Sequence, residues 1–72
     1  MKATQENIVE VINNLQKNNQ EISWPQIVAA VKAVGITVKN WMLVRGILQW
    51  FINEGKLTRT ADVNVEVYTC NH

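Results

Sequence analysis

The last residues of the chain offer the clearest candidates for metal or nucleophilic chemistry. Cys70 and His72 are spaced as Cys-x-His, and they are the single cysteine and the single histidine of the sequence. A structural zinc site needs four ligands, so this pair cannot close one. No acidic pair, phosphate-loop glycine motif or Ser/His/Asp set is evident for catalysis. We therefore expect a protein that is not an enzyme, with Cys70 as an incidental free thiol and with no metal or cofactor.

Charge is distributed unevenly along the chain, although the formal net charge of its 72 residues is only +1. Residues 1–36 carry three lysines against three glutamates and sum to zero. Residues 39–59 carry four cations against Glu54 alone, which leaves a local charge of +3. These four cations are Lys39, Arg45, Lys56 and Arg59. Such local basicity fits a modest nucleic-acid footprint, and it equally fits an ordinary solvated surface.

Size and composition indicate one small globular domain over residues 1–72. A hydrophobic fraction of 47% is enough for a packed core and too high for a disordered chain. Residues 1–11 lack the long apolar core of a signal peptide. The longest mainly apolar run, residues 41–52, is interrupted by polar residues and is too short to span a bilayer. We therefore expect a soluble cytoplasmic protein that does not interact with membranes.

Apolar residues at helical spacing predict the first two helices, over residues 4–17 and 23–34. Thr4 is a suitable N-cap for the first helix. Ser23 can cap the second, where Gln26 three residues later completes a capping box. The apolar stripes comprise Ile8, Val11, Ile12 and Leu15 in the first helix, and Ile27, Ala30, Val31 and Val34 in the second.

A third helix is predicted over residues 38–53, with Thr37 as its N-cap. Gly35 precedes it and Gly55 follows it, and glycine readily adopts the left-handed conformation that ends helices. The apolar arc of this third helix comprises Trp41, Val44, Ile47, Leu48, Phe51 and Ile52. The opposite face comprises Lys39, Met42, Arg45, Gly46, Gln49 and Asn53. Leu43 and Trp50 lie together at the edge of the apolar arc, near Lys39.

After the third predicted helix, the pattern of apolar residues changes from helical spacing to the alternation of strands. A β-hairpin is predicted over residues 56–69. Residues 56–60 and 65–69 are rich in threonine and valine, which favours strands. Residues 61–64 form the expected turn, without the Asn-Gly or Asp-Gly signal of a tight hairpin. Residues 70–72 are expected to fray.

This order of elements resembles that of the winged helix-turn-helix DNA-binding superfamily, in its small single-domain regulators. The resemblance covers nearly the whole chain and centres on residues 27–44, IVAAVKAVGITVKNWMLV. Small residues occupy the middle of the first helix of this motif, as close helix crossing requires. The other matching residues are Gly35 at the turn and the apolar Ile36, Trp41 and Val44. The resemblance implies an α+β fold in which a short strand at residues 21–22 pairs with the hairpin, the wing.

In this superfamily the third helix enters the major groove of double-stranded DNA and the wing touches the DNA backbone. The resemblance therefore implies a small transcriptional regulator. Lys39, Arg45 and Gln49 would lie on the DNA-facing side of the helix, where Arg can read guanine, Gln can read adenine and Lys can hold phosphate. Lys56 and Arg59 would contact phosphate from the wing. A solvated helix and an ordinary edge hairpin would carry similar residues.

A protein-interaction module is the alternative, such as an adaptor or inhibitor of host machinery from a mobile element or phage. The weak net charge and the acids Asp62 and Glu66 near the wing favour it. Leu43 and Trp50 are the partner-binding candidates, since Trp is enriched at interface hot spots. The simpler interpretation is that the hairpin or Tyr68 covers Trp50. We expect a monomer in free solution, because the core should consume the apolar stripe of the first helix, with pairing only on DNA.

Overall fold

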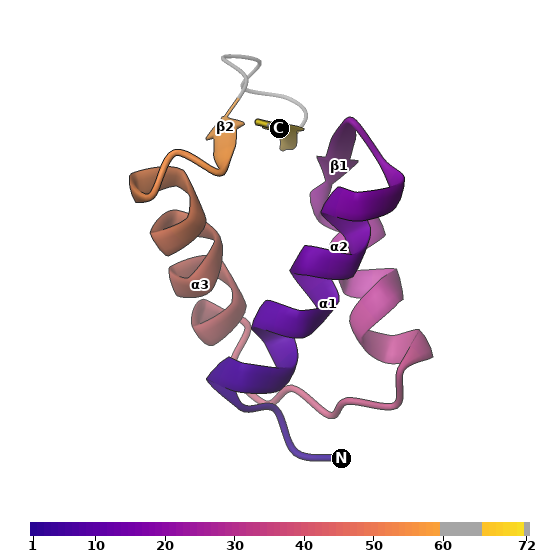
Figure 1. Ribbon diagram of the computed structural model, residues 1–72. Coiled ribbons are helices and arrows are strands. Elements are labelled where there is room, and N and C mark those ends of the chain that lie inside the picture. The colour runs from indigo at the N-terminus through magenta and orange to yellow at the C-terminus, as the bar shows by residue number, and fades with distance from the viewer. Residues whose placement is uncertain (60–65, 72) are drawn as a thin grey trace.

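The computed structural model of the chain describes residues 1–59 and 66–71 (Figure 1). The elements follow in the order α1 (Gln5–Asn18), β1 (Glu21–Ser23), α2 (Trp24–Ala33), α3 (Met42–Asn53), β2 (Leu57–Arg59) and β3 (Val67–Cys70). The protein is therefore a small α+β domain, as predicted. In Figure 1, α1 lies between α2 and α3, and the sheet and the N-terminus lie at opposite ends of the helices.

The three strands form an antiparallel sheet in the order β1-β3-β2, so the last strand of the chain is the central one. Tyr68 of β3 is paired with Ile22 of β1 on one side and with Arg59 of β2 on the other. The expected pairing of residues 21–22 with the C-terminal segment is confirmed. In the described residues the hairpin strands begin later than predicted, at Leu57 and Val67, and the second continues to Cys70. The predicted turn at residues 61–64 lies outside the described residues.

The starts of α1 and α2 follow the predicted capping pattern. Thr4 Oγ1 accepts a hydrogen bond from the Asn7 backbone N–H at 3.2 Å, and Asn7 Oδ1 accepts one from the Thr4 N–H at 2.8 Å. Ser23 and Gln26 make the same reciprocal pair at 3.4 Å. These local bonds satisfy N–H groups that the first turn of a helix would leave unpaired.

The start of α3 differs from the prediction, because the helix begins at Met42 rather than at residue 38. Thr37 does not cap it. Its N–H donates to the Met1 carbonyl at 2.6 Å and its carbonyl accepts from the Ala3 N–H at 3.1 Å. The N-terminal segment thus holds Thr37 in a parallel β-bridge with Lys2. The N-cap residue is Trp41, which makes no side-chain cap bond, and the Met42 N–H donates to Asn40 Oδ1 at 3.0 Å.

The hydrophobic core is formed by all three helices and by the sheet. Its buried residues are Ile8, Val11, Ile12, Ile22, Ile27, Val31, Ile36, Val44, Ile47, Leu48, Phe51, Leu57, Tyr68 and Cys70. Most of the residues predicted for the helix stripes are among them. Gly35 and Gly55 have φ values of 87° and 77°, which confirms that glycines in the left-handed region end α2 and α3.

The predicted fraying at residues 70–72 is wrong for the two of these residues that the structure describes. Cys70 is paired with Leu57 in the sheet and is buried, and the loss of solvation raises the pKa of its thiol. Asn71 Nδ2 donates to the Gly55 carbonyl at 2.9 Å and to Thr58 Oγ1 at 2.8 Å. The C-terminal segment is therefore tied to the end of α3 and to β2.

Candidate nucleic-acid interface

The outer face of α3 is the surface turned away from the core, formed by Met42, Gly46, Gln49 and Asn53. These residues are exposed, whereas the core-facing side of the helix is buried. Gln49 Nε2 donates to Asn53 Oδ1 at 3.0 Å one turn along the helix. A Cβ at Gly46 would meet no atom within 4 Å, so the middle of this face is open. The face is uncharged and carries two amide side chains that can donate and accept hydrogen bonds.

Arg45 lies on the flank of α3 that faces α2 and the start of β3. Its Nη1 donates to Glu66 Oε1 at 2.9 Å, and this hydrogen bond is the main reason that the pKa of Arg45 is raised. The guanidinium carbon lies 4.3 Å from the centre of the Trp24 ring, within cation–π range. Both charged side chains remain 42% exposed, so the ion pair is accessible to a competing anion.

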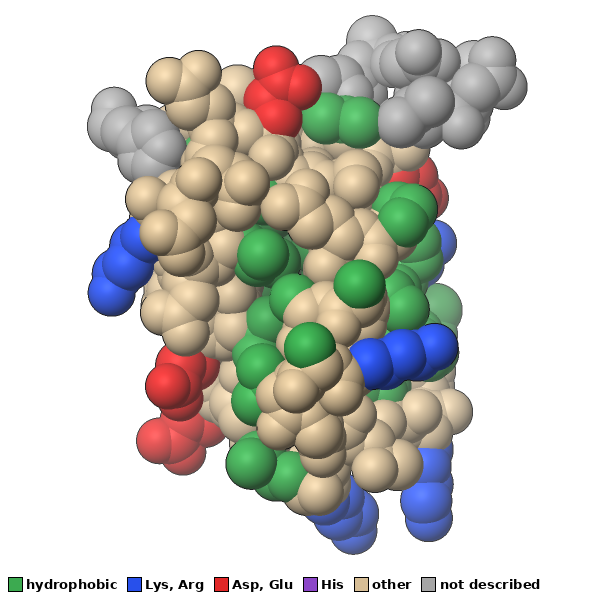
Figure 2. Space-filling model, turned by 90° about the vertical axis from the view of Figure 1, so that its right-hand side faces the viewer, with side chains coloured by type: hydrophobic (Ala, Val, Ile, Leu, Met, Phe, Trp, Pro, Cys, Tyr) green, Lys and Arg blue, Asp and Glu red, His purple; other side chains and the backbone are tan. Residues whose placement is uncertain are grey.

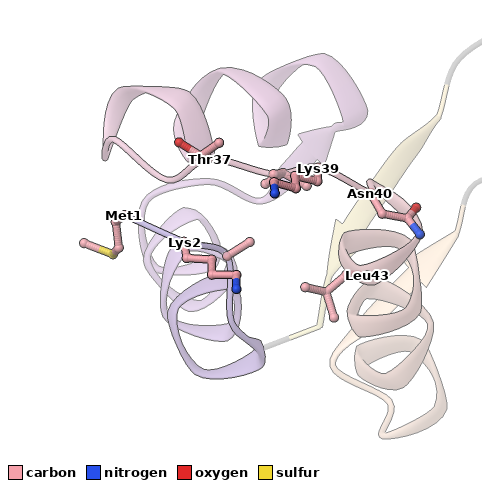
Figure 3. Close-up of a pocket in the computed structure, with 8 residues that line it drawn as sticks. Met1, Lys2, Thr37, Lys39, Asn40 and Leu43 are labelled. Atoms are coloured by element: carbon pink, nitrogen blue, oxygen red, sulfur yellow. The ribbon is translucent and has the colours of Figure 1, made fainter.

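Lys39 lies in the loop between α2 and α3 and not on α3, because the helix starts three residues later than Lys39. It lines an open pocket of about 500 Å³ between the N-terminal segment and the start of α3 (Figure 3). Lys2 comes to this pocket from the N-terminal segment, and Leu43 comes from the first turn of α3. The sequence prediction missed Lys2, because only the pairing of Lys2 with Thr37 places it beside Lys39.

Trp50 lies on the same flank of α3 as Leu43, and it is exposed. The interpretation that the hairpin or Tyr68 covers it is wrong for the described residues, because Trp50 remains 43% exposed and Tyr68 is buried in the sheet. The Lys56 ammonium lies 5.0 Å from the centre of the Trp50 ring. Arg59 lies elsewhere, on β2, with its guanidinium carbon 5.9 Å from the centre of the Tyr68 ring.

The structure therefore separates the predicted DNA-binding residues into three places. Gln49 is on the outer face of α3, with Arg45 on one flank of that face. Lys39 and Lys56 lie at the two ends of the other flank. Arg59 is in the sheet, beside residues outside the described part of the chain. The structure thus surrounds an uncharged face with cations and does not gather all five residues on it.

Acidic residues are absent from the sequence between Glu21 and Glu54, a stretch that contains all of α2 and α3. The same stretch contains Lys32, Lys39 and Arg45. In Figure 2, blue lysine and arginine side chains occupy the lower end of the molecule, where the α2–α3 loop lies in Figure 1. A polyanion that approaches α2 and α3 therefore meets no carboxylate from these helices, although it meets the Glu66 carboxylate that is paired with Arg45.

Comparison of the chain with protein-family models, with curated proteins and with solved structures found no match. Within residues 1–59 and 66–71, no helix is long and apolar enough to cross a membrane. In the same part of the chain, no three histidine, cysteine, aspartate or glutamate side chains converge as metal ligands.

Proposed function

We propose that this protein is a small winged-helix transcriptional regulator that binds double-stranded DNA with α3. One observation carries the proposal: the acid-free stretch formed by α2 and α3 presents the uncharged outer face of α3 between flanking cations. The strand order β1-β3-β2 supports the winged-helix assignment, since β1, the short strand before α2, pairs with β3 of the C-terminal segment.

The chemistry of the outer face suits contact with base edges. Gln49 and Asn53 each carry an amide, and an amide can pair with adenine through two hydrogen bonds in the major groove. Met42 supplies an exposed apolar contact for a thymine methyl group. Lys39 and Lys56, at the two ends of one flank of α3, would hold phosphates there.

A substitution at Gly46 tests the proposal without disturbing the core, because a side chain there meets open space. Fluorescence anisotropy at low salt would measure binding to mixed-sequence and AT-rich duplexes. We expect Gly46→Ala to bind as wild type does and Gly46→Glu to bind about tenfold more weakly, because the carboxylate faces the phosphates. Wild-type affinity should fall as salt rises, because phosphate contacts release counterions.

Asn14→Glu is the matched control, since it adds the same charge at an exposed position of α1. It should leave DNA affinity nearly unchanged. The proposal fails if wild type does not bind either duplex at low salt, or if Gly46→Glu and Asn14→Glu affect binding equally.

A protein-interaction module is the second candidate function, and a specific observation favours it. Leu43 and Trp50 remain 40% and 43% exposed on one flank of α3, and Met42 beside them is 69% exposed. Large apolar side chains that are exposed together commonly mark interaction sites.

A further inference from the structure

We propose that the flank of α3 nearest α1 binds an acidic amphipathic helix of a partner protein. This surface, the Leu43/Trp50 flank, consists of Leu43 and Trp50 with Lys39 at one end and Lys56 at the other. It lies on the opposite side of the outer face from Arg45, and it shares Lys39 and Lys56 with the proposed DNA-binding surface.

The apolar centre of the flank has the dimensions of a helix-binding site. Leu43 and Trp50 are seven residues apart, so they lie on one side of α3 about two turns, or roughly 10 Å, from each other. A partner helix that lies alongside would place apolar residues at the same i, i+3, i+4 and i+7 spacing against them. The pocket beside Leu43 adds apolar walls from Ala3 and Val38, which gives one partner side chain a place to insert.

The charges at the ends of the flank indicate the chemistry of the partner. Lys2 and Lys39 line the pocket of about 500 Å³ at the start of α3. At the other end, Lys17 and Lys56 line a second open pocket of about 390 Å³. Among residues 1–59 and 66–71, no carboxylate lines either pocket. An apolar centre with cations at both ends is complementary to an amphipathic helix whose apolar face is bordered by aspartate and glutamate.

A second copy of this chain suits the flank poorly. A two-fold contact of the flank with itself would bring the cations of one copy against those of the other. The acidic side of α1 carries Glu6 and Glu10, but the large exposed hydrophobic residues among those described are elsewhere: Met1, Val34, Met42, Leu43 and Trp50. Nucleic acid would match the lysines through its phosphates, and an unpaired base could stack on Trp50, but Leu43 and the apolar walls of its pocket would have no matching group. A different protein chain is therefore the favoured occupant.

Selection from a randomised peptide library tests the proposal, with the full chain as bait and peptides of about 15 residues, long enough to form a helix. We expect enriched peptides to combine acidic residues with apolar residues at helical spacing. Repeating the selection with Leu43→Ala or Trp50→Ala as bait should remove that enrichment. The proposal is wrong if no such peptides are enriched, or if the same peptides are enriched on either variant.

Affinities of an enriched peptide for matched variants locate its binding site. Trp50→Ala should weaken binding by about tenfold or more, as truncation of a hot-spot residue does. Lys39→Ala and Lys56→Ala should weaken it less, in a salt-dependent way. The controls Val34→Ala and Lys32→Ala should have no effect, since Val34 is exposed beyond α2 and Lys32 lines a pocket with Arg45. Circular dichroism of each variant would verify its fold.

Two further measurements would overturn the proposal in favour of other occupants. One is binding of single-stranded oligothymidine that depends on Trp50 and competes with the peptide. The other is a dimer of the wild-type chain that Trp50→Ala dissociates. Gln49 lies on the side of the outer face away from Leu43 and Trp50, so Gln49→Ala should weaken DNA binding and leave peptide binding unchanged. Failure of DNA binding and failure of peptide binding can therefore be distinguished.

Discussion

Tertiary contacts change the role that the sequence suggests for Arg45. On α3 alone it is an exposed cation, well placed to read a guanine. In the folded chain its guanidinium lies between the Trp24 ring and the Glu66 carboxylate. The Glu66 carbonyl also accepts a hydrogen bond from the Trp24 N–H at 2.9 Å, so the backbone fixes Glu66 at the start of α2. A DNA phosphate would have to displace this carboxylate before it could bind Arg45.

We predict that Glu66→Gln strengthens DNA binding by about threefold to tenfold at low salt, because it frees Arg45 for one more phosphate contact. The salt dependence should become steeper for the same reason. The free energy of unfolding should change by less than about 1 kcal/mol, since exposed ion pairs contribute little to stability. Anisotropy titrations measure the DNA affinity and its salt dependence, and urea denaturation measures the free energy of unfolding. Equal strengthening by Glu10→Gln, an exposed acid on α1, would show that only net charge matters.

At the scale of single elements, local signals predicted the helix starts of α1 and α2 and failed at α3. Thr4 and Ser23 bond to residues three positions later, so each cap is contained within its own sequence segment. Thr37 had the same local potential as a cap. Its backbone is instead bonded to Met1 and Ala3, about 35 residues away along the chain, which a local pattern cannot anticipate.

We predict that Gly46→Ala stabilises the protein by about 0.5–1 kcal/mol, because glycine in a helix interior loses more backbone entropy on folding than alanine does. The new methyl group would meet no atom within 4 Å. Urea denaturation should show a higher midpoint with an unchanged slope. The contrasting control is Gly55→Ala, which should destabilise by about 1 kcal/mol, because Gly55 has a φ of 77°. A Gly46→Ala variant less stable than wild type would contradict the prediction.

At the scale of the whole molecule, segments distant in the sequence hold this small domain together. β3 joins β1 to β2, and the N-terminal segment pairs with the α2–α3 loop. Gln16 Nε2 of α1 donates to the Lys56 carbonyl at 3.0 Å, which ties α1 to the end of α3. No side-chain nitrogen or oxygen buried among the described residues lacks a hydrogen-bond partner. These long-range contacts bring both ends of the chain into the fold.

We predict that the protein is a monomer in free solution. The buried stripe of α1 is used by the core, and contact between two Leu43/Trp50 flanks would place lysines against lysines. Sedimentation at micromolar concentration should give a species of 8.2 kDa at low and moderate salt. A stable species of twice that mass, dissociated by Trp50→Ala, would show that the flank is a dimer interface.

The sequence by itself determined the class of elements, their order, two helix caps, the glycine stops and most of the core. Each of these depends on residues close together in the chain or on apolar periodicity, which one segment contains in full. It also indicated Arg45, Gln49 and Trp50 as surface candidates, because they fall outside the centre of the apolar arc.

Only the tertiary structure decided what those candidates contact. It paired Arg45 with Glu66, brought Lys2 beside Lys39, shortened α3 and left Trp50 uncovered beside Lys56. It also made the terminal segment of the chain the centre of the sheet and buried Cys70 there. These outcomes depend on residues far apart in the sequence, and their mutual positions are set by the packing of whole elements rather than by any local preference.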